Sequence, residues 1–180
     1  MSEAIAAKRY ADALFRLSEQ KQATDQIEQQ LRIVLEVFEG NKQLLPFLKH
    51  PKVSNDKKKQ LIRETFHHFS KEVINTFLLL VDRHREELIP AIIGHYIDME
   101  NDAKGIAEAK VYTTRELSVE EKTQLSNVFA KKLNKSTLKI DNIVDPSIIG
   151  GVKLRIGNRI YDGTISGKLE RIERNLVSAK

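Results

Sequence analysis

The glycine-rich segment 163–169 is the nearest approach in this sequence to a phosphate-binding loop. Gly163 and Gly167 precede Lys168. A nucleotide-binding P-loop needs four residues between its glycines to form the amide cradle, and a Ser or Thr after the lysine to hold magnesium. Here three residues separate the glycines, and Leu169 occupies the hydroxyl position. We therefore interpret the segment as a tight turn before a helix, and we expect no cofactor.

The remaining reactive residue types also lack a catalytic or metal-binding arrangement. No histidine lies three or four positions from another, and neighbours such as His67 and His68 point about 100° apart on a helix. The absence of cysteine excludes thiolate catalysis, disulfides and cysteine-ligated zinc. No Ser/His/Asp grouping has the context of a nucleophile elbow. The sequence therefore predicts a protein that is not an enzyme, with no catalytic, cofactor-binding or metal site.

The net charge of +5 comes entirely from the second part of the chain. Residues 1–104 contain 16 basic and 16 acidic residues, whereas residues 105–180 contain 14 basic and 9 acidic ones. Such asymmetry indicates either a solvated basic surface or an acidic partner. A basic nucleic-acid-binding adaptor is the alternative function. Against it, this part offers only Tyr112, Phe129 and Tyr161 for base stacking, and Phe129 is expected in the core.

Residues 1–105 show the apolar spacing of successive amphipathic helices. Apolar side chains recur three or four positions apart, as one buried helical face requires; the clearest set is Ile27, Leu31, Val34, Leu35 and Phe38. Ser54 and Ser70 precede two further helical segments and are expected to cap them. Gly105 is expected to end the last helix. The pattern predicts five or six helices with short connections, hence a helical bundle.

Residues 106–180 change to the alternating pattern of half-buried strands. Strands are expected at 107–112, 138–144 and 152–156, with a hairpin turn at Gly157-Asn158 leading to 160–161. Ser118 and Glu121 form a capping box that predicts a helix between the first two strands. The predicted fold class is α+β, with an all-α bundle over 1–105 followed by a small α/β module over 106–180.

The last helix of this module is expected to begin at a serine cap and to bury one apolar face. Ser166 is the expected N-cap residue. Leu169, Ile172 and Leu176 follow at helical spacing and are expected inside.

Two helices of the first part carry more apolar residues than one buried face requires. Residues 73–81 are apolar almost all round, and the first helix has two apolar sides. Burial at the centre of the bundle explains most of these residues. The alternative is a groove between the two helices that accepts an amphipathic helix from a partner.

Nothing in the sequence predicts insertion into a membrane. The first fifteen residues mix charged and apolar positions and lack the apolar stretch of a secretory signal. The longest apolar run, 73–81, falls far short of the roughly 20 residues that a spanning helix needs. We therefore expect membrane association only through a partner.

Two segments resemble a known family. Residues 7–15 resemble the opening helix of the δ subunits of F-type ATP synthases, a family that includes the mitochondrial oligomycin-sensitivity-conferring protein. Residues 145–157, continued by 161–169, closely resemble its C-terminal signature. The resemblance implies a six-helix bundle and a C-terminal module with no catalysis of their own. It also implies one copy in a bacterial complex at the cytoplasmic face of the cell membrane, acting in the stator that keeps the catalytic head from rotating.

The resemblance also implies partners and candidate contact residues. The bundle would bind the N-terminal helices of the α subunits in a groove between its first and fifth helices. By position, that groove takes Tyr10, Ala13, Leu17, Phe77 and Leu79. The C-terminal module would bind the C-terminal ends of the b subunits, which form the peripheral stalk. For that contact the residues expected are Lys168, Arg171 and Arg174.

Overall fold

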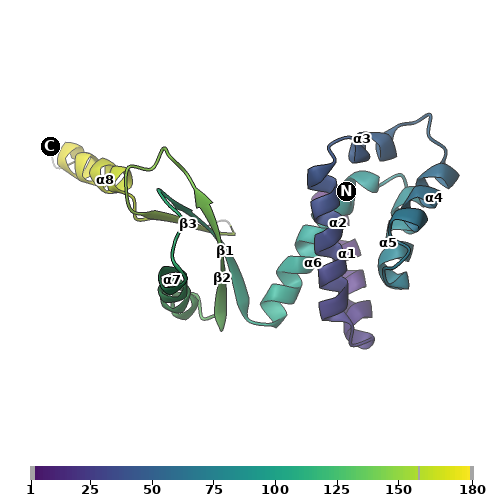
Figure 1. The fold of residues 1–180 in the computed structure, drawn as a ribbon, viewed down its shortest axis with the longest axis horizontal. Helices are drawn as coiled ribbons and strands as arrows, with labels where there is room; N and C mark the ends of the chain where they lie inside the picture. The colour runs from purple at the N-terminus through teal and green to yellow at the C-terminus, as the bar shows by residue number, and fades with distance from the viewer. Residues whose placement is uncertain (1–2, 158, 179–180) are drawn as a thin grey trace. The chain divides into compact units, whose positions relative to one another are not determined.

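The computed structural model describes residues 3–157 and 159–178, and these form two compact units (Figure 1). The first comprises residues 1–100 and the second residues 101–180. The described residues of the first unit contain helices and no strand, whereas the second combines helices with a sheet. The predicted mixture of helix and sheet, with a helical N-terminal region, is confirmed. No helix within the described residues has both the length and the apolar character needed to cross a membrane.

The helical N-terminal region follows the predicted order of segments. Its α-helices are α1 Glu3–Gln20, α2 Thr24–Gly40, α3 Leu44–Lys49, α4 Asn55–Thr65, α5 Lys71–Asp82 and α6 Ile89–Ala103. A 3-10 turn, η1 Glu86–Leu88, precedes α6. Gly105 follows α6 with a φ of 65°, the left-handed conformation that a glycine adopts at low cost after a helix.

The two predicted serine caps differ in their hydrogen bonds. Ser54 caps α4, and its hydroxyl accepts a hydrogen bond from the amide of Lys57 at 3.5 Å. Ser70 occupies the N-cap position of α5, but its side chain makes no cap hydrogen bond. Instead, both its hydroxyl and its amide donate to Oε1 of Gln30, at 2.8 Å and 3.0 Å. Ser70 therefore links α5 to α2, a contact that the local sequence could not indicate.

The core of the first unit gathers residues from its helices around Tyr96. The Tyr96 ring meets Phe15 edge to face at 5.5 Å, and its hydroxyl donates to Oγ of Ser18 at 2.8 Å. Fully buried tyrosines need such a partner because an unsatisfied hydroxyl costs free energy. The other large side chains that are less than 2% exposed are Ile27, Leu31, Val34, Val73, Phe77, Leu80, Val81, Ile89, Ile92 and Ile93.

The second unit contains a four-stranded sheet with the spatial order β2-β1-β3-β4. Its strands are β1 Ile106–Thr113, β2 Thr137–Val144, β3 Val152–Ile156 and β4 Arg159–Asp162. β1 and β2 are parallel, whereas β3 pairs antiparallel with both β1 and β4. Gly157, with a φ of 55°, begins the predicted hairpin turn, and Asn158 lies outside the described residues.

Two helices, α7 Val119–Lys132 and α8 Ile165–Ser178, complete the second unit. The predicted capping box is present at the start of α7, where Ser118 and Glu121 exchange hydrogen bonds. α7 connects the parallel strands β1 and β2 and packs against β2 (Figure 1). Among the described residues, the buried apolar side chains of this unit are Ala109, Val111, Ala130, Leu138 and Leu154, with Phe129 half-buried beside them.

Candidate partner-binding surfaces

The two apolar sides of α1 have different environments. Ala7, Ala11 and Leu14 are buried in the core. On the other side, Ala13 is exposed and Leu17 keeps 38% of its surface exposed, while Tyr10 is half-buried. The second apolar side of α1 is therefore accessible to solvent.

Helix α5 shows a similar division. Val73, Leu80 and Val81 are buried, whereas Leu79 is 44% exposed. Phe77, which the resemblance placed in the groove, is only 1% exposed and therefore does not lie on the accessible surface. Its position four residues after the buried Val73 and three before the buried Leu80 puts it on the buried face of the helix, and its ring meets Phe66 with the centroids 6.1 Å apart.

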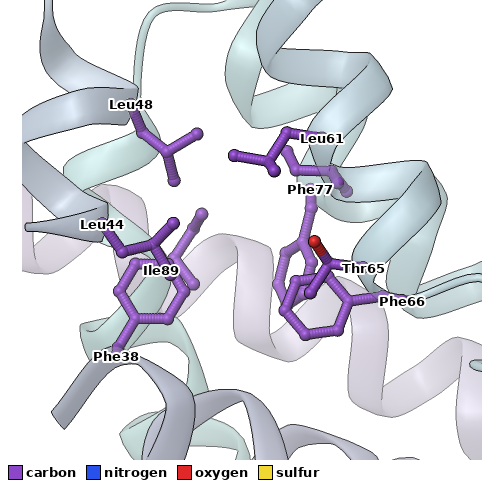
Figure 2. Close-up of a pocket in the computed structure, with 9 residues that line it drawn as sticks. Phe38, Leu44, Leu48, Leu61, Thr65, Phe66, Phe77 and Ile89 are labelled. Carbon is purple, nitrogen blue, oxygen red and sulfur yellow. The ribbon is translucent and has the colours of Figure 1, made fainter. Parts of the chain in front are cut away.

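Figure 2 shows where the ring of Phe77 lies. Phe38, Leu44 and Leu48 approach from one side, and residues of α4 approach from the other. These side chains enclose an apolar cavity of about 20 Å³, also lined by Leu61, Ile62, Thr65, Phe66 and Ile89. A cavity of this volume holds at most about one water molecule. It is therefore a packing gap in the core and not a ligand site.

Helices α1 and α5 contact one another and run in opposite directions. At one end, Lys21 after α1 forms an ion pair with Glu72 in the first turn of α5. At the other end, Arg85 after α5 donates to the hydroxyl of Tyr10 at 3.3 Å, and its guanidinium lies 5.9 Å from the ring centroid. The hydrogen bond from Lys21 also lowers the pKa of Glu72 below its ordinary value.

These contacts define one surface, which we call the α1–α5 surface. It consists of Tyr10, Ala13 and Leu17 on α1 and Leu79 on α5. Four of the five predicted groove residues therefore lie on two adjacent helices with at least part of each side chain accessible. The polar contacts at its two ends, both formed by residues far apart in the sequence, were not predicted.

In the second unit, the three predicted basic residues lie on α8 and all are exposed. Arg171 already has backbone partners: its Nη2 donates to the carbonyl of Asp162 at 2.9 Å and its Nε to that of Gly167 at 3.0 Å. Nε of Arg174 points to the carbonyl of Glu170 at 3.5 Å. Arg171 therefore ties α8 to the end of β4.

The segment that approaches a P-loop pattern forms a hydrogen-bonded joint at the start of α8. Oδ1 of Asp162 accepts from both the amide and the hydroxyl of Thr164, at 2.9 Å and 2.7 Å. Oγ1 of Thr164 in turn accepts from the amide of Gly167 at 3.1 Å. Ser166 lies inside the helix, so the predicted cap there is wrong and Thr164 performs that role. The amides of Thr164 and Gly167 therefore donate to the chain's own side chains.

The three apolar residues of α8 that were expected inside are exposed, so that prediction is wrong. Leu169, Ile172 and Leu176 are 59%, 56% and 69% exposed, and Ile165 is 46% exposed. The periodicity was interpreted correctly as one apolar face. It could not reveal that α8 extends away from the sheet (Figure 1), so that these side chains stay exposed.

The described residues contain one cluster of carboxylates close enough to share an ion. Oxygens of Asp25, Glu28 and Glu100 lie within 4.8 Å of one another, and the last two residues are buried. Nε of Arg32 donates to Glu28 at 2.8 Å, so a guanidinium already offsets part of the negative charge. His67 and His68 lie in the turn after α4 and not on a helix, so the expected separation of about 100° is wrong: their ring centroids are 3.6 Å apart, with the rings tilted by 44°.

Comparisons with known proteins identify relatives of this chain. Residues 6–176 match the family model described as ATP synthase delta (OSCP) subunit. The chain is 55% identical to the ATP synthase subunit delta of Geobacillus sp. (strain WCH70), covering 98% of this chain and 99% of that protein. It is 51% identical to the subunit delta of Oceanobacillus iheyensis, covering 99% of each.

The fold also matches a solved structure. A chain in the cryo-EM structure of the Toxoplasma gondii mitochondrial ATP synthase hexamer aligns with a TM-score of 0.79 and 18% identity, covering 95% of this chain and 97% of that chain. At this identity the likeness supports the fold alone, while the sequence matches extend over nearly the whole length of each protein. The chain therefore belongs to the ATP synthase delta (OSCP) subunit family.

Proposed function

We propose that this protein is a non-catalytic stator subunit that links the α subunits of the catalytic head to the b subunits of the peripheral stalk. In this role it prevents the head from turning with the rotor. The first unit would act as a six-helix bundle that binds the head, and the second unit would bind the stalk. One copy would serve each complex, at the cytoplasmic face of the bacterial membrane, and the chain would be held there only by its partners.

The observation that carries this proposal is the exposed apolar α1–α5 surface. An amphipathic helix binds by laying its apolar face on accessible apolar side chains between two helices. Leu17 and Leu79 provide such area, and Ala13 is small enough to let a backbone approach closely. Tyr10 adds a rigid ring with a hydroxyl at the edge. An N-terminal helix of an α subunit fits this chemistry.

The polar ends of this surface support a bound segment of limited length. The Lys21–Glu72 ion pair and the Tyr10–Arg85 contact mark its two ends. From Tyr10 to Lys21 a helix rises about 16 Å at 1.5 Å per residue. An amphipathic helix of about three turns would cover that distance and place its polar termini beside these charged groups.

The nucleic-acid alternative is not favoured by the aromatic side chains of the second unit. Phe129 and Tyr161 pack edge to face at 5.3 Å, next to the buried cluster. The ammonium of Lys132 lies 4.8 Å from the Tyr161 ring centroid. Both rings are half-buried and already contact the chain's own side chains, which leaves little ring surface for the base stacking on which single-strand binding depends.

Reconstitution tests the proposed function. Membranes that contain ATP synthase without its delta subunit should regain ATP-driven proton pumping when the purified chain is added, because the head is then held against the rotor. ATP hydrolysis by the purified chain alone should be absent. The proposal fails if the chain neither associates with such complexes nor restores pumping.

A further inference from the structure

We propose that α8 is a strap that closes over an apolar groove of its own unit in the free chain. The structure shows the open state, in which α8 extends away from the sheet (Figure 1). Closure would hide the apolar face of α8 and so regulate access to it. The groove, which we call the α7–β3 groove, has a volume of about 330 Å³ and is lined by Leu117, Glu121, Gln124, Leu125, Val128 and Val152.

Two apolar surfaces of the second unit are uncovered in the open state. One is the α8 seam, which consists of the exposed side chains of Leu169, Ile172 and Leu176. The other is the α7–β3 groove, where Val128 is 62% exposed. Contact of apolar surface with water is unfavourable, and contiguous apolar patches on a protein surface usually have an occupant. Each of the two surfaces supplies the apolar area that would cover the other.

The start of α8 is fixed beside the groove. The amide of Gly163 donates to the carbonyl of Val152, which lines the groove, at 2.9 Å. The amide of Ile165 donates to the carbonyl of Gly150 at 3.0 Å. Gly151 has a φ of 86°, and a Cβ there would overlap the carbonyl oxygen of Gly163, so the two backbone segments lie in direct contact. The strap therefore begins next to the surface that it would cover.

Gly167 provides the hinge. It lies in the first turn of α8, where glycine weakens a helix because its backbone is the least restricted. The turn closed by Asp162 and Thr164 precedes this glycine, whereas the whole α8 seam follows it. Past the hinge, an exposed hydrogen bond from Nη2 of Arg171 to the carbonyl of Asp162 joins α8 to β4. Water competes for such exposed polar groups, so this contact opposes closure only weakly.

The α8 seam and the α7–β3 groove match in length and direction. On α7 the groove extends over residues 121–128, and the seam extends over residues 169–176. Each interval corresponds to about 10 Å of helix. Val152 pairs with Thr113 at the end of β1, from which the chain leads into α7. The hinge therefore lies near the start of α7, and the closed strap would lie along α7 in the same direction.

Charges and the covalent link both favour the chain's own α8 as the occupant of the groove. Glu121 lines the groove in the first turn of α7, and Lys168 flanks the seam directly after the hinge. Closure in the direction described would bring these opposite charges to the same end of the contact, where flanking pairs stabilise packed helices. Because the hinge tethers the strap beside the groove, its effective concentration there is in the millimolar range, well above that of a second copy in dilute solution.

Disulfide formation tests closure directly, because the chain contains no cysteine of its own. Val128→Cys combined with Ile172→Cys places one thiol in the groove and one on the seam of the full chain. Mild oxidation should join them within one chain at least about tenfold faster than in the control pair Val119→Cys with Ile172→Cys. Val119 is also exposed on α7, but at 100° per residue it lies on the opposite side of that helix from Val128.

Limited trypsin digestion provides a second measurement that needs no new thiol. Cleavage within α8 requires local opening of the helix, which the closed state suppresses. Val128→Asp puts a carboxylate into the apolar groove and should speed this cleavage several-fold, whereas Val119→Asp should leave its rate unchanged. The cleavage products to measure by mass spectrometry are those that end at Lys168, Arg171 and Arg174.

The two measurements have clear contrary outcomes. Equal rates of disulfide formation in the two cysteine pairs would overturn the inference, and so would equal cleavage of the wild type and Val128→Asp. Disulfides that join two chains would also overturn it and would assign the groove to the seam of a second copy. All the substituted side chains are exposed, so each variant keeps the fold. None of these results depends on the proposed function.

Discussion

Substitution of Ala13 by Asp gives the most specific test of the head-binding surface. Ala13 is exposed on α1, between Tyr10 and Leu17, so a carboxylate there stays in water in the free protein. When a partner helix covers the surface, the same carboxylate loses water and faces apolar side chains. The substitution should therefore separate binding from folding.

Two free energies set the expected change in Kd: the gain from covering the neighbouring leucines, which the wild-type contact provides, and the cost of desolvating the new carboxylate. Full burial of a leucine is worth about 1.5–3 kcal/mol. Leu17 and Leu79 are 38% and 44% exposed, so covering the rest of both contributes about 1.2–2.5 kcal/mol. Desolvating an unpaired carboxylate at the centre costs about 2–3 kcal/mol, which corresponds to a Kd about 30- to 150-fold higher.

Isothermal titration with a synthetic N-terminal peptide of the α subunit measures this effect. Ala91→Asp is the matched control, because Ala91 is an exposed alanine on α6 of the same unit. Urea unfolding should show that each variant loses at most about 1 kcal/mol of stability, since both sites are on the surface. The reasoning would be refuted by equal peptide affinities for the wild type and Ala13→Asp.

Three further predictions concern stability. Tyr96→Phe removes the buried hydrogen bond to Ser18 and should reduce the free energy of unfolding by about 1 kcal/mol in urea titrations; no change would show that the bond contributes nothing net. Glu86→Leu should lower the free energy of unfolding by about 3–5 kcal/mol, because it leaves the buried ammonium of Lys58 unpaired. Adding Lys58→Met should recover most of that loss; a double variant as unstable as the single one would contradict this. Hydrogen bonds from Thr164 lower the pKa of Asp162. The ionised Asp162 carboxylate therefore adds to the free energy of unfolding above its unfolded pKa of about 3.9, and this contribution is lost as the pH falls through the lower folded pKa. The stability difference between the wild type and Asp162→Asn should therefore be constant above about pH 5 and shrink below about pH 4; a difference that grows with acidity would reverse the assigned sign.

The elements of the fold could be predicted from the sequence where local signals and burial agree. The capping box at Ser118 and the alternating pattern of residues 152–156 depend only on neighbouring residues. The structure has the expected helix start at the first and the expected strand at the second. Ser70 shows the limit of such reasoning. Its type and position predict a local cap, but Gln30, forty residues earlier in the chain, takes its hydrogen bonds.

The candidate sites were harder to predict because periodicity identifies an apolar face but not what covers it. On α5 the face that contains Phe77 is closed by neighbouring helices, whereas Leu79 remains accessible. On α8 the same kind of pattern predicted burial, and Leu169 and Ile172 are exposed instead. The difference arises from contacts between distant segments, such as the approach of Gly151 to Gly163, that no local pattern encodes.

The central claim is that one copy of the chain holds two partners at once through separate surfaces. Sedimentation velocity of the full chain with two differently labelled peptides measures this directly. One peptide has the sequence of the N-terminus of the α subunit, and the other has that of the C-terminal helix of the b subunit. Both labels should move together with a single copy of the chain, and each should bind equally well in the presence of the other. Displacement of one peptide by the other would contradict the account.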